Sequence, residues 1–118
     1  MTVVLVCGGR DYMDRDRLFN VMDQCHFKRG VTLVVNGGAK GADQLSMKWA
    51  MSRQLCFLTM PAQWDQYGKK AGMIRNESML ENPWDITVNL IVAFKGGIGT
   101  RGMITLGRQR QVEVVEVP

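Results

Sequence analysis

The sequence lacks the features that mark membrane-spanning, metal-binding and disulfide-stabilised proteins. No apolar run approaches the ~18 residues that a membrane-spanning helix needs, and no leader of basic, apolar and small residues precedes the first run. The single histidine, His26, has no cysteine or histidine at the spacing of metal ligands. The three cysteines, Cys7, Cys25 and Cys56, lie in apolar stretches, which favours reduced core thiols over a disulfide framework. We therefore expect a cytoplasmic protein with no metal site and no bound cofactor.

Long stretches of one charge are also missing. The 118 residues include 15 Lys and Arg against 11 Asp and Glu, a net charge of +4, without the basic run of a nucleic-acid-binding tail. This surplus favours an anionic partner, and it fits a phosphate-bearing small molecule as well as a nucleic acid. We expect no membrane partner.

The length predicts a single domain that spans residues 1–118.

The sequence does contain a regular alternation of apolar runs and segments of helical periodicity. The predicted strands are Thr2–Cys7, Val31–Val35, Leu55–Leu58, Val88–Phe94 and Val112–Val117. The predicted helices lie between Asp14 and Gly30, over 42–53, over Met73–Glu81 and over Gly102–Arg108, with a loop over Gln63–Gly72. This alternation predicts an α/β fold of three layers, with a mainly parallel five-stranded sheet and helices on both faces. In such sheets, ligands bind where the strand order reverses, which we expect beside the first strand.

Nine of the 13 glycines lie in three loops, each of which follows a predicted strand. Glycine permits close backbone approach, and loops at helix N-termini present N–H groups and positive dipole ends to an anion. The three loops together predict a phosphate cradle, although any one of them taken alone is equally well explained as a tight turn. None is a Walker A motif or a complete G-x-G-x-x-G fingerprint, which argues against an ordinary ATPase or dehydrogenase.

Charged side chains flank these loops, and two aromatic residues lie in the loop after the third predicted strand. Arg10 suits bidentate binding of a phosphate, and Asp11 suits either a ribose hydroxyl or a helix cap. Asp43 begins the predicted helix over 42–53, where it suits a helix cap. Trp64 and Tyr67 offer rings for stacking on a base, but packing over a helix is the commoner role of such aromatics.

Four motifs, taken in order, resemble those of the SLOG superfamily, specifically its YspA-like branch. They are Gly8-Gly9-Arg10-Asp11, Gly37-Gly38-Ala39-Lys40-Gly41-Ala42-Asp43, Ala71-Gly72-Met73-Ile74-Arg75-Asn76-Glu77-Ser78-Met79-Leu80 and Gly96-Gly97-Ile98-Gly99-Thr100. The resemblance covers nearly the whole chain. It implies a Rossmann-like domain that binds nucleotides or their derivatives, often ADP-ribose-like, and frequently in NAD-linked or defence-related systems. Relatives include the LOG phosphoribohydrolases, which activate cytokinins, and the DNA-processing protein DprA.

The chain departs from the hydrolases of this superfamily at their catalytic motifs. Their Pro-Gly-Gly-x-Gly-Thr-x-x-Glu motif supplies a catalytic Glu, where this chain has Lys95 in place of Pro and Met103 in place of Glu. Their Arg-Lys-x-x-Met motif is matched by Arg75 and Met79, with Asn76 in place of Lys. A methionine cannot stabilise an oxocarbenium ion or move a proton, so the resemblance favours binding over hydrolysis.

The residues and the resemblance together give one set of expectations. The ligand-binding candidates are Gly8, Gly9, Arg10, Asp11, Gly37, Gly38, Ala39, Gly41, Asp43, Arg75, Asn76, Lys95, Gly96, Gly97, Gly99 and Thr100. The resemblance implies binding of an ADP-ribose-like or cyclic ADP-ribose-type signal, by a sensor or a sequestering protein. The first alternative is a nucleoside 5'-monophosphate phosphoribohydrolase, for which Arg75 and Glu77 are the catalytic candidates, and the second is DprA-like binding of single-stranded DNA. We also expect a homo-oligomer, most simply a dimer.

Overall fold

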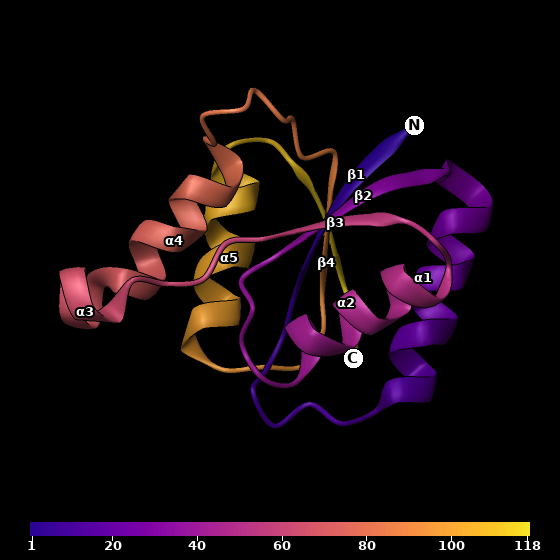
Figure 1. Ribbon diagram of the computed structural model, residues 1–118, viewed down its shortest axis with the longest axis horizontal. Helices are drawn as coiled ribbons and strands as arrows, with labels where there is room; N and C mark the ends of the chain where they lie inside the picture. The colour runs from indigo at the N-terminus through magenta and orange to yellow at the C-terminus, as the bar shows by residue number, and fades with distance from the viewer.

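The apolar runs of the sequence form the strands of one sheet in the computed structural model, which describes residues 1–118 (Figure 1). The elements follow one another as β1 (Thr2–Cys7), α1 (Arg15–Arg29), β2 (Val31–Asn36), α2 (Ala42–Ser52), β3 (Cys56–Thr59), α3 (Trp64–Tyr67), the 3-10 helix η1 (Gly68–Lys70), α4 (Ala71–Leu80), β4 (Leu90–Ala93), α5 (Ile98–Gln109) and β5 (Glu113–Glu116). The strand order is β3-β2-β1-β4-β5, and every neighbouring pair is parallel. The expected Rossmann-like α/β fold is therefore confirmed.

The sheet separates two apolar cores, because successive side chains of a strand point to opposite faces. Val4 and Val6 of the central strand β1 pack with Trp49 in the core under α1 and α2. Leu5 of the same strand packs with Met103 in the core under α4 and α5. Figure 1 shows the two helix pairs on opposite sides of the sheet. The domain thus has the three layers that the sequence predicts.

The helix α1 begins and ends at the residues that the sequence predicts. The side chain of Asp14 accepts a hydrogen bond from the backbone N–H of Arg17 at 3.1 Å, which satisfies a donor of the first turn. Gly30 ends the helix with a φ of +67°, a conformation that glycine adopts without strain. The next residue, Val31, begins β2.

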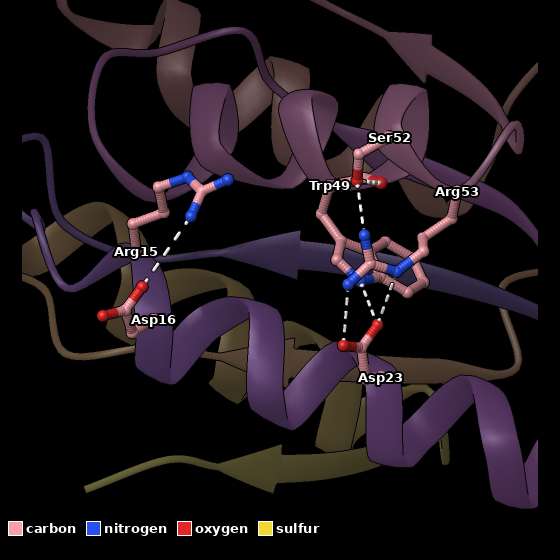
Figure 2. Close-up of polar contacts among 6 residues, drawn as sticks. All are labelled: Arg15, Asp16, Asp23, Trp49, Ser52 and Arg53. Carbon is pink, nitrogen blue, oxygen red and sulfur yellow. Dashed lines mark hydrogen bonds and ion pairs between the residues drawn. The ribbon is translucent and has the colours of Figure 1, made fainter.

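A polar cluster joins α1 to α2 (Figure 2). The Nε and Nη2 atoms of Arg53 donate to the two carboxylate oxygens of Asp23, at 2.9 and 2.8 Å. The indole Nε1 of Trp49, whose ring is fully buried, donates to the same carboxylate at 2.9 Å. One acidic side chain therefore fixes the packing of the two helices on this face.

Two segments differ from the prediction. The predicted loop over Gln63–Gly72 contains the short helices α3 and η1 and the start of α4. No residue of α3 or η1 is buried, so this segment carries no apolar periodicity that sequence reading can detect. The helix predicted over Gly102–Arg108 begins earlier, at Ile98, because the packing of Thr100 and Met103 outweighs the low helix propensity of the surrounding glycines.

The cysteines also differ in part from the expectation. All three are free thiols, and Cys7 is buried, but Cys56 is exposed. It lies on β3, one of the two edge strands of the sheet, where one side of the strand has no neighbour.

None of the helices combines the length and the apolar character that crossing a bilayer requires.

Candidate functional site

A cavity opens where the strand order reverses, between β1 and β4. Because the chain leaves these neighbouring strands toward opposite faces of the sheet, a crevice forms beyond their carboxyl ends. The loops after β1, β2 and β4 gather at this end, along the lower edge of Figure 1. The cavity has a volume of about 830 Å³ and extends from these loops to α3, α4 and one face of α5.

Hydrogen bonds between glycine-rich segments hold the three loops together. The N–H of Gly9 donates to the carbonyl of Lys95 at 2.9 Å, and the carbonyl of Gly9 accepts from the N–H of Ala42 at 3.3 Å. A Cβ on Gly8 would lie 2.5 Å from the Cβ of Ala42, and one on Gly96 would lie 2.7 Å from the backbone nitrogen of Gly9. These glycines therefore serve the contact between loops.

The loop after β2 contains two glycines in the left-handed region. Gly38 has a φ of +74° and Gly41 a φ of +82°, conformations that a residue with a Cβ rarely adopts. The N–H of Gly38 donates to the side-chain oxygen of the buried Asn36 at 2.9 Å. Both glycines shape the turn from β2 into α2, and neither lines the cavity.

Asp43, in the first turn of α2, holds the same loop. One oxygen of its buried carboxylate accepts from the N–H groups of Gly37 and Ala39, each at 3.2 Å. Burial raises the pKa of this carboxyl, and the two N–H donors and the charge of Arg75 oppose the shift. These two N–H groups are already bonded, so this loop is a wall of the cavity more than a source of free donors.

Arg75 approaches the loop from α4. Its Nη1 donates to the carbonyl of Gly37 at 2.9 Å, and its Nε donates to the side-chain oxygen of Asn76 at 3.0 Å. Burial lowers the pKa of Arg75, while the charge of Asp43 acts in the opposite direction. Nη2 has no hydrogen-bond partner, which leaves part of the guanidinium free for a ligand.

The start of α5 supplies free backbone donors. Gly97 precedes the helix and no side chain caps it, while Ile98, Gly99 and Thr100 form the first turn. N–H groups in the first turn of a helix have no intrahelical acceptor, and the helix dipole places partial positive charge there. All four residues line the cavity. This helix end is thus suited to an anion such as a phosphate.

Comparison with known proteins supplies the family. The sequence model of the YspA, cpYpsA-related SLOG family matches residues 2–67. The chain belongs to this SLOG family. It is also 33% identical to the Gene 61 protein of Mycobacterium phage D29 over 123 residues, which cover 98% of this chain and 95% of that protein. No solved structure matches significantly. Membership confirms the resemblance to the SLOG superfamily, the matched residues include the first two of the four motifs, and the family suggests a nucleotide-related ligand.

The structure of this SLOG protein brings most of the predicted site residues to the cavity. Those that line it are Gly8, Gly9, Arg10, Gly37, Ala39, Asp43, Arg75, Asn76, Gly97, Gly99 and Thr100. Those that lie outside it are Asp11, Gly38, Gly41, Lys95 and Gly96. Of the latter group, Asp11 and Lys95 are exposed, and the glycines shape the surrounding turns.

Further residues line the cavity of the SLOG protein but are not among the ligand-binding candidates predicted from the sequence. Among them are Trp64 and Lys69 from the segment predicted as a loop. On α5, the cavity is also lined by Thr105, Leu106 and Gln109, which follow Ile98 at helical spacing. This spacing can be recognised in the sequence only when α5 is predicted to begin at Ile98. Glu77, which the sequence does predict as a catalytic candidate of the hydrolase alternative, also lines the cavity.

Two buried side chains near the cavity have no acid–base capacity near neutral pH. Burial raises the pKa of the Cys7 thiol to about 12, so it remains protonated. Met103, at the position of the hydrolases' glutamate, is only 1% exposed and packs in the core under α5. This SLOG protein therefore has no acid at that position, and the space around it is apolar.

Proposed function

We propose that this SLOG protein binds a nucleotide-derived small molecule of the ADP-ribose or cyclic ADP-ribose type, as a sensor or a sequestering protein. One observation carries the proposal: the uncapped N-terminus of α5 and Arg75, whose Nη2 has no hydrogen-bond partner, line one cavity at the switch point of the sheet. Both groups attract an anion, and their combination suits the phosphates of a nucleotide.

The charges and the size of the cavity support the same reading. Arg10 and Arg75 both line it, and the positive charge of Arg10 contributes to the lowered pKa of Arg75. An anion bound near both guanidinium groups relieves this repulsion. The volume of about 830 Å³ lies in the range typical of small-molecule sites.

The proposal is tested by calorimetry and thermal shift with ADP-ribose, its cyclic isomers, NAD and AMP. Arg75→Ala removes a charge-assisted contact of about 1.5 to 3 kcal/mol, so affinity should fall roughly ten- to a hundredfold. Lys28→Ala is the matched control, because it removes one positive charge from the last turn of α1, outside the cavity. Failure of every compound to stabilise the protein at concentrations well above micromolar contradicts the proposal.

A second candidate function is hydrolysis of a nucleoside 5'-monophosphate. The observation that favours it is that Glu77 and Arg75, two residues apart on α4, line the same cavity. In that case the Glu77 carboxylate would replace the acid that the chain lacks at Met103. Incubation with AMP followed by chromatography for free adenine distinguishes the two functions. If the unmodified protein releases adenine and the Glu77→Gln variant does not, the protein is a hydrolase. We expect no release of adenine.

A further inference from the structure

Trp64 is a cavity residue without an assigned role. It begins α3, its side chain is part of the cavity wall, and 48% of the residue is exposed. The first turn of α4 lies against one edge of the indole, since a Cβ on Gly72 would be 3.4 Å from Cη2 of the ring. The indole is thus supported at one edge, and about half of the residue is free of protein contacts.

A flat group already lies over this ring. The guanidinium of Arg10, which comes from the loop after β1, is 5.9 Å from the ring centroid. This distance is at the outer limit of cation–π contacts, and at an exposed site such a contact is weak. The structure has no ion pair or hydrogen bond for the Arg10 guanidinium. Arg10 is therefore free to leave the ring for a stronger partner.

We propose that Trp64 is the stacking platform for the nucleobase of the ligand, an inference that rests on the proposed function. Stacking of a base on an aromatic side chain contributes more than an exposed cation–π contact, so a base displaces Arg10 from the ring. The displaced guanidinium then makes charge-assisted hydrogen bonds with a phosphate of the same ligand. Binding of the base and release of Arg10 toward the phosphate are coupled steps.

This assignment distinguishes two regions of the cavity by chemistry. The start of α5 and Arg75 bind the anionic part of the ligand. Their contribution to the affinity should be the same for a sugar phosphate and a nucleotide. Trp64 contacts only a ligand that carries a planar ring. The part of the affinity that the base contributes should therefore depend on the side chain at position 64.

The test compares AMP, ADP-ribose and ribose 5-phosphate by calorimetry. AMP and ribose 5-phosphate differ only in the base. We expect Trp64→Ala to lower the affinity for AMP and ADP-ribose about five- to a hundredfold. The affinity for ribose 5-phosphate should change less than twofold. Trp64→Phe should retain most of the affinity, because it keeps an aromatic ring. Trp84→Ala is the matched control, since Trp84 is 57% exposed but lies outside the cavity.

Each outcome decides the inference. An unchanged affinity of Trp64→Ala for AMP, or an equal loss for AMP and ribose 5-phosphate, overturns the stacking role and leaves the proposed function standing. Absence of binding of all three compounds to the unmodified protein overturns the inference, and the proposed function is overturned with it when the cyclic isomers and NAD also fail to bind. Circular dichroism of each variant verifies the fold, which should be intact because α3 contains no buried residue.

Discussion

Asp43 and Arg75 hold the loop after β2 from two sides. The N–H of Gly37 donates to the carboxylate of Asp43, and its carbonyl accepts from Arg75. The two charged side chains thus position the two peptide units on either side of Gly37 at the cavity wall. We expect Asp43 to act through the loop and not by contact with a ligand phosphate, which its negative charge would repel. Its role is therefore that of a positioning residue.

Asp43→Ala should leave two N–H groups of the loop without their acceptor. We expect a loss of about 1–3 kcal/mol in the free energy of unfolding, measured in urea, and weaker ligand binding because the loop loosens. Asp43→Asn should lose less, because it retains a side-chain oxygen. The control is Asp11→Ala, an exposed carboxylate outside the cavity. Equal stability of Asp43→Ala and the unmodified protein would contradict this role.

Met103→Glu would restore the acid found in the hydrolases, but it would place a carboxylate in an apolar core. Since Met103 is 1% exposed, we expect a loss of about 3 kcal/mol or more in stability and no gain of hydrolysis. Met51→Glu makes the same change on α2 at a residue that is 63% exposed and should be nearly neutral. Thermal unfolding compares the two variants, and equal midpoints would show that position 103 is accessible.

The helix α5 illustrates how an element creates a site by where it begins. It starts at Ile98, directly behind the glycines of the β4–α5 loop, and so presents its first turn to the cavity. The glycines of this loop differ in their surroundings. A Cβ on Gly97 would meet no atom within 4 Å, and the φ of Gly97 is −101°, outside the region that requires glycine.

Gly97→Val and Gly96→Val should therefore separate binding from folding. At position 97 the added methyl groups enter the open space before α5, so we expect nearly normal stability and a loss of ligand affinity of tenfold or more. At position 96 the Cβ meets the backbone of Gly9, so we expect about 1–3 kcal/mol of destabilisation. Calorimetry measures the ligand affinity of each variant, and urea unfolding measures its free energy of unfolding. Full ligand affinity of Gly97→Val would place the anion site elsewhere.

The contact between α1 and α2 should depend on pH. The hydrogen bonds from Arg53, with a smaller contribution from Trp49, hold the pKa of Asp23 below its ordinary value of 3.8. The stabilisation is present at pH values above 3.8 and is lost as the pH falls below this value, when the carboxylate is protonated. The cluster is partly exposed, so its contribution is about 1 kcal/mol at most. The difference in melting temperature between the unmodified protein and Asp23→Asn should shrink between neutral pH and pH ~3, and a constant difference would contradict this.

At the scale of the whole molecule, the central strand β1 links the two cores. Val4 and Val6 belong to one core and Leu5 to the other, so loss of β1 removes part of both. The strand also pairs with β2 on one side and β4 on the other. Neither half of the sheet retains a complete core without it.

We therefore predict one cooperative unfolding transition, which would support a single domain. The fluorescence of the buried Trp49 reports on one core, and far-UV circular dichroism reports on the whole chain. The two signals should give the same urea midpoint within error. Trp64 and Trp84 are exposed, so a Trp64→Phe/Trp84→Phe double variant isolates the signal of Trp49. Two separate midpoints would indicate that the halves unfold independently.

The sequence predicts the fold well because β1 and β4 are almost entirely apolar and α1 carries clear signals at both ends. Asp14 and Gly30, for example, bound α1 as predicted. It also predicts the end of the sheet at which the glycine-rich loops gather, because parallel strands bring their carboxyl ends together. The role of Asp43 was not predictable, since only the folded loop shows which N–H groups its carboxylate accepts from. Trp64 was weighed as a stacking residue, but its place on the cavity wall depends on α3, which has no sequence signal.

The two edges of the sheet differ in their resistance to self-association. On β5, the acidic Glu113 and Glu116 form ion pairs with Arg29 and Arg108, and such charges on an edge strand oppose the addition of another strand. The sequence of β3, Cys-Phe-Leu-Thr, carries no charge, and its exposed Cys56 is a free thiol. Concentrated, aged or oxidised samples should therefore aggregate through β3, and a reducing agent should preserve the monodisperse protein.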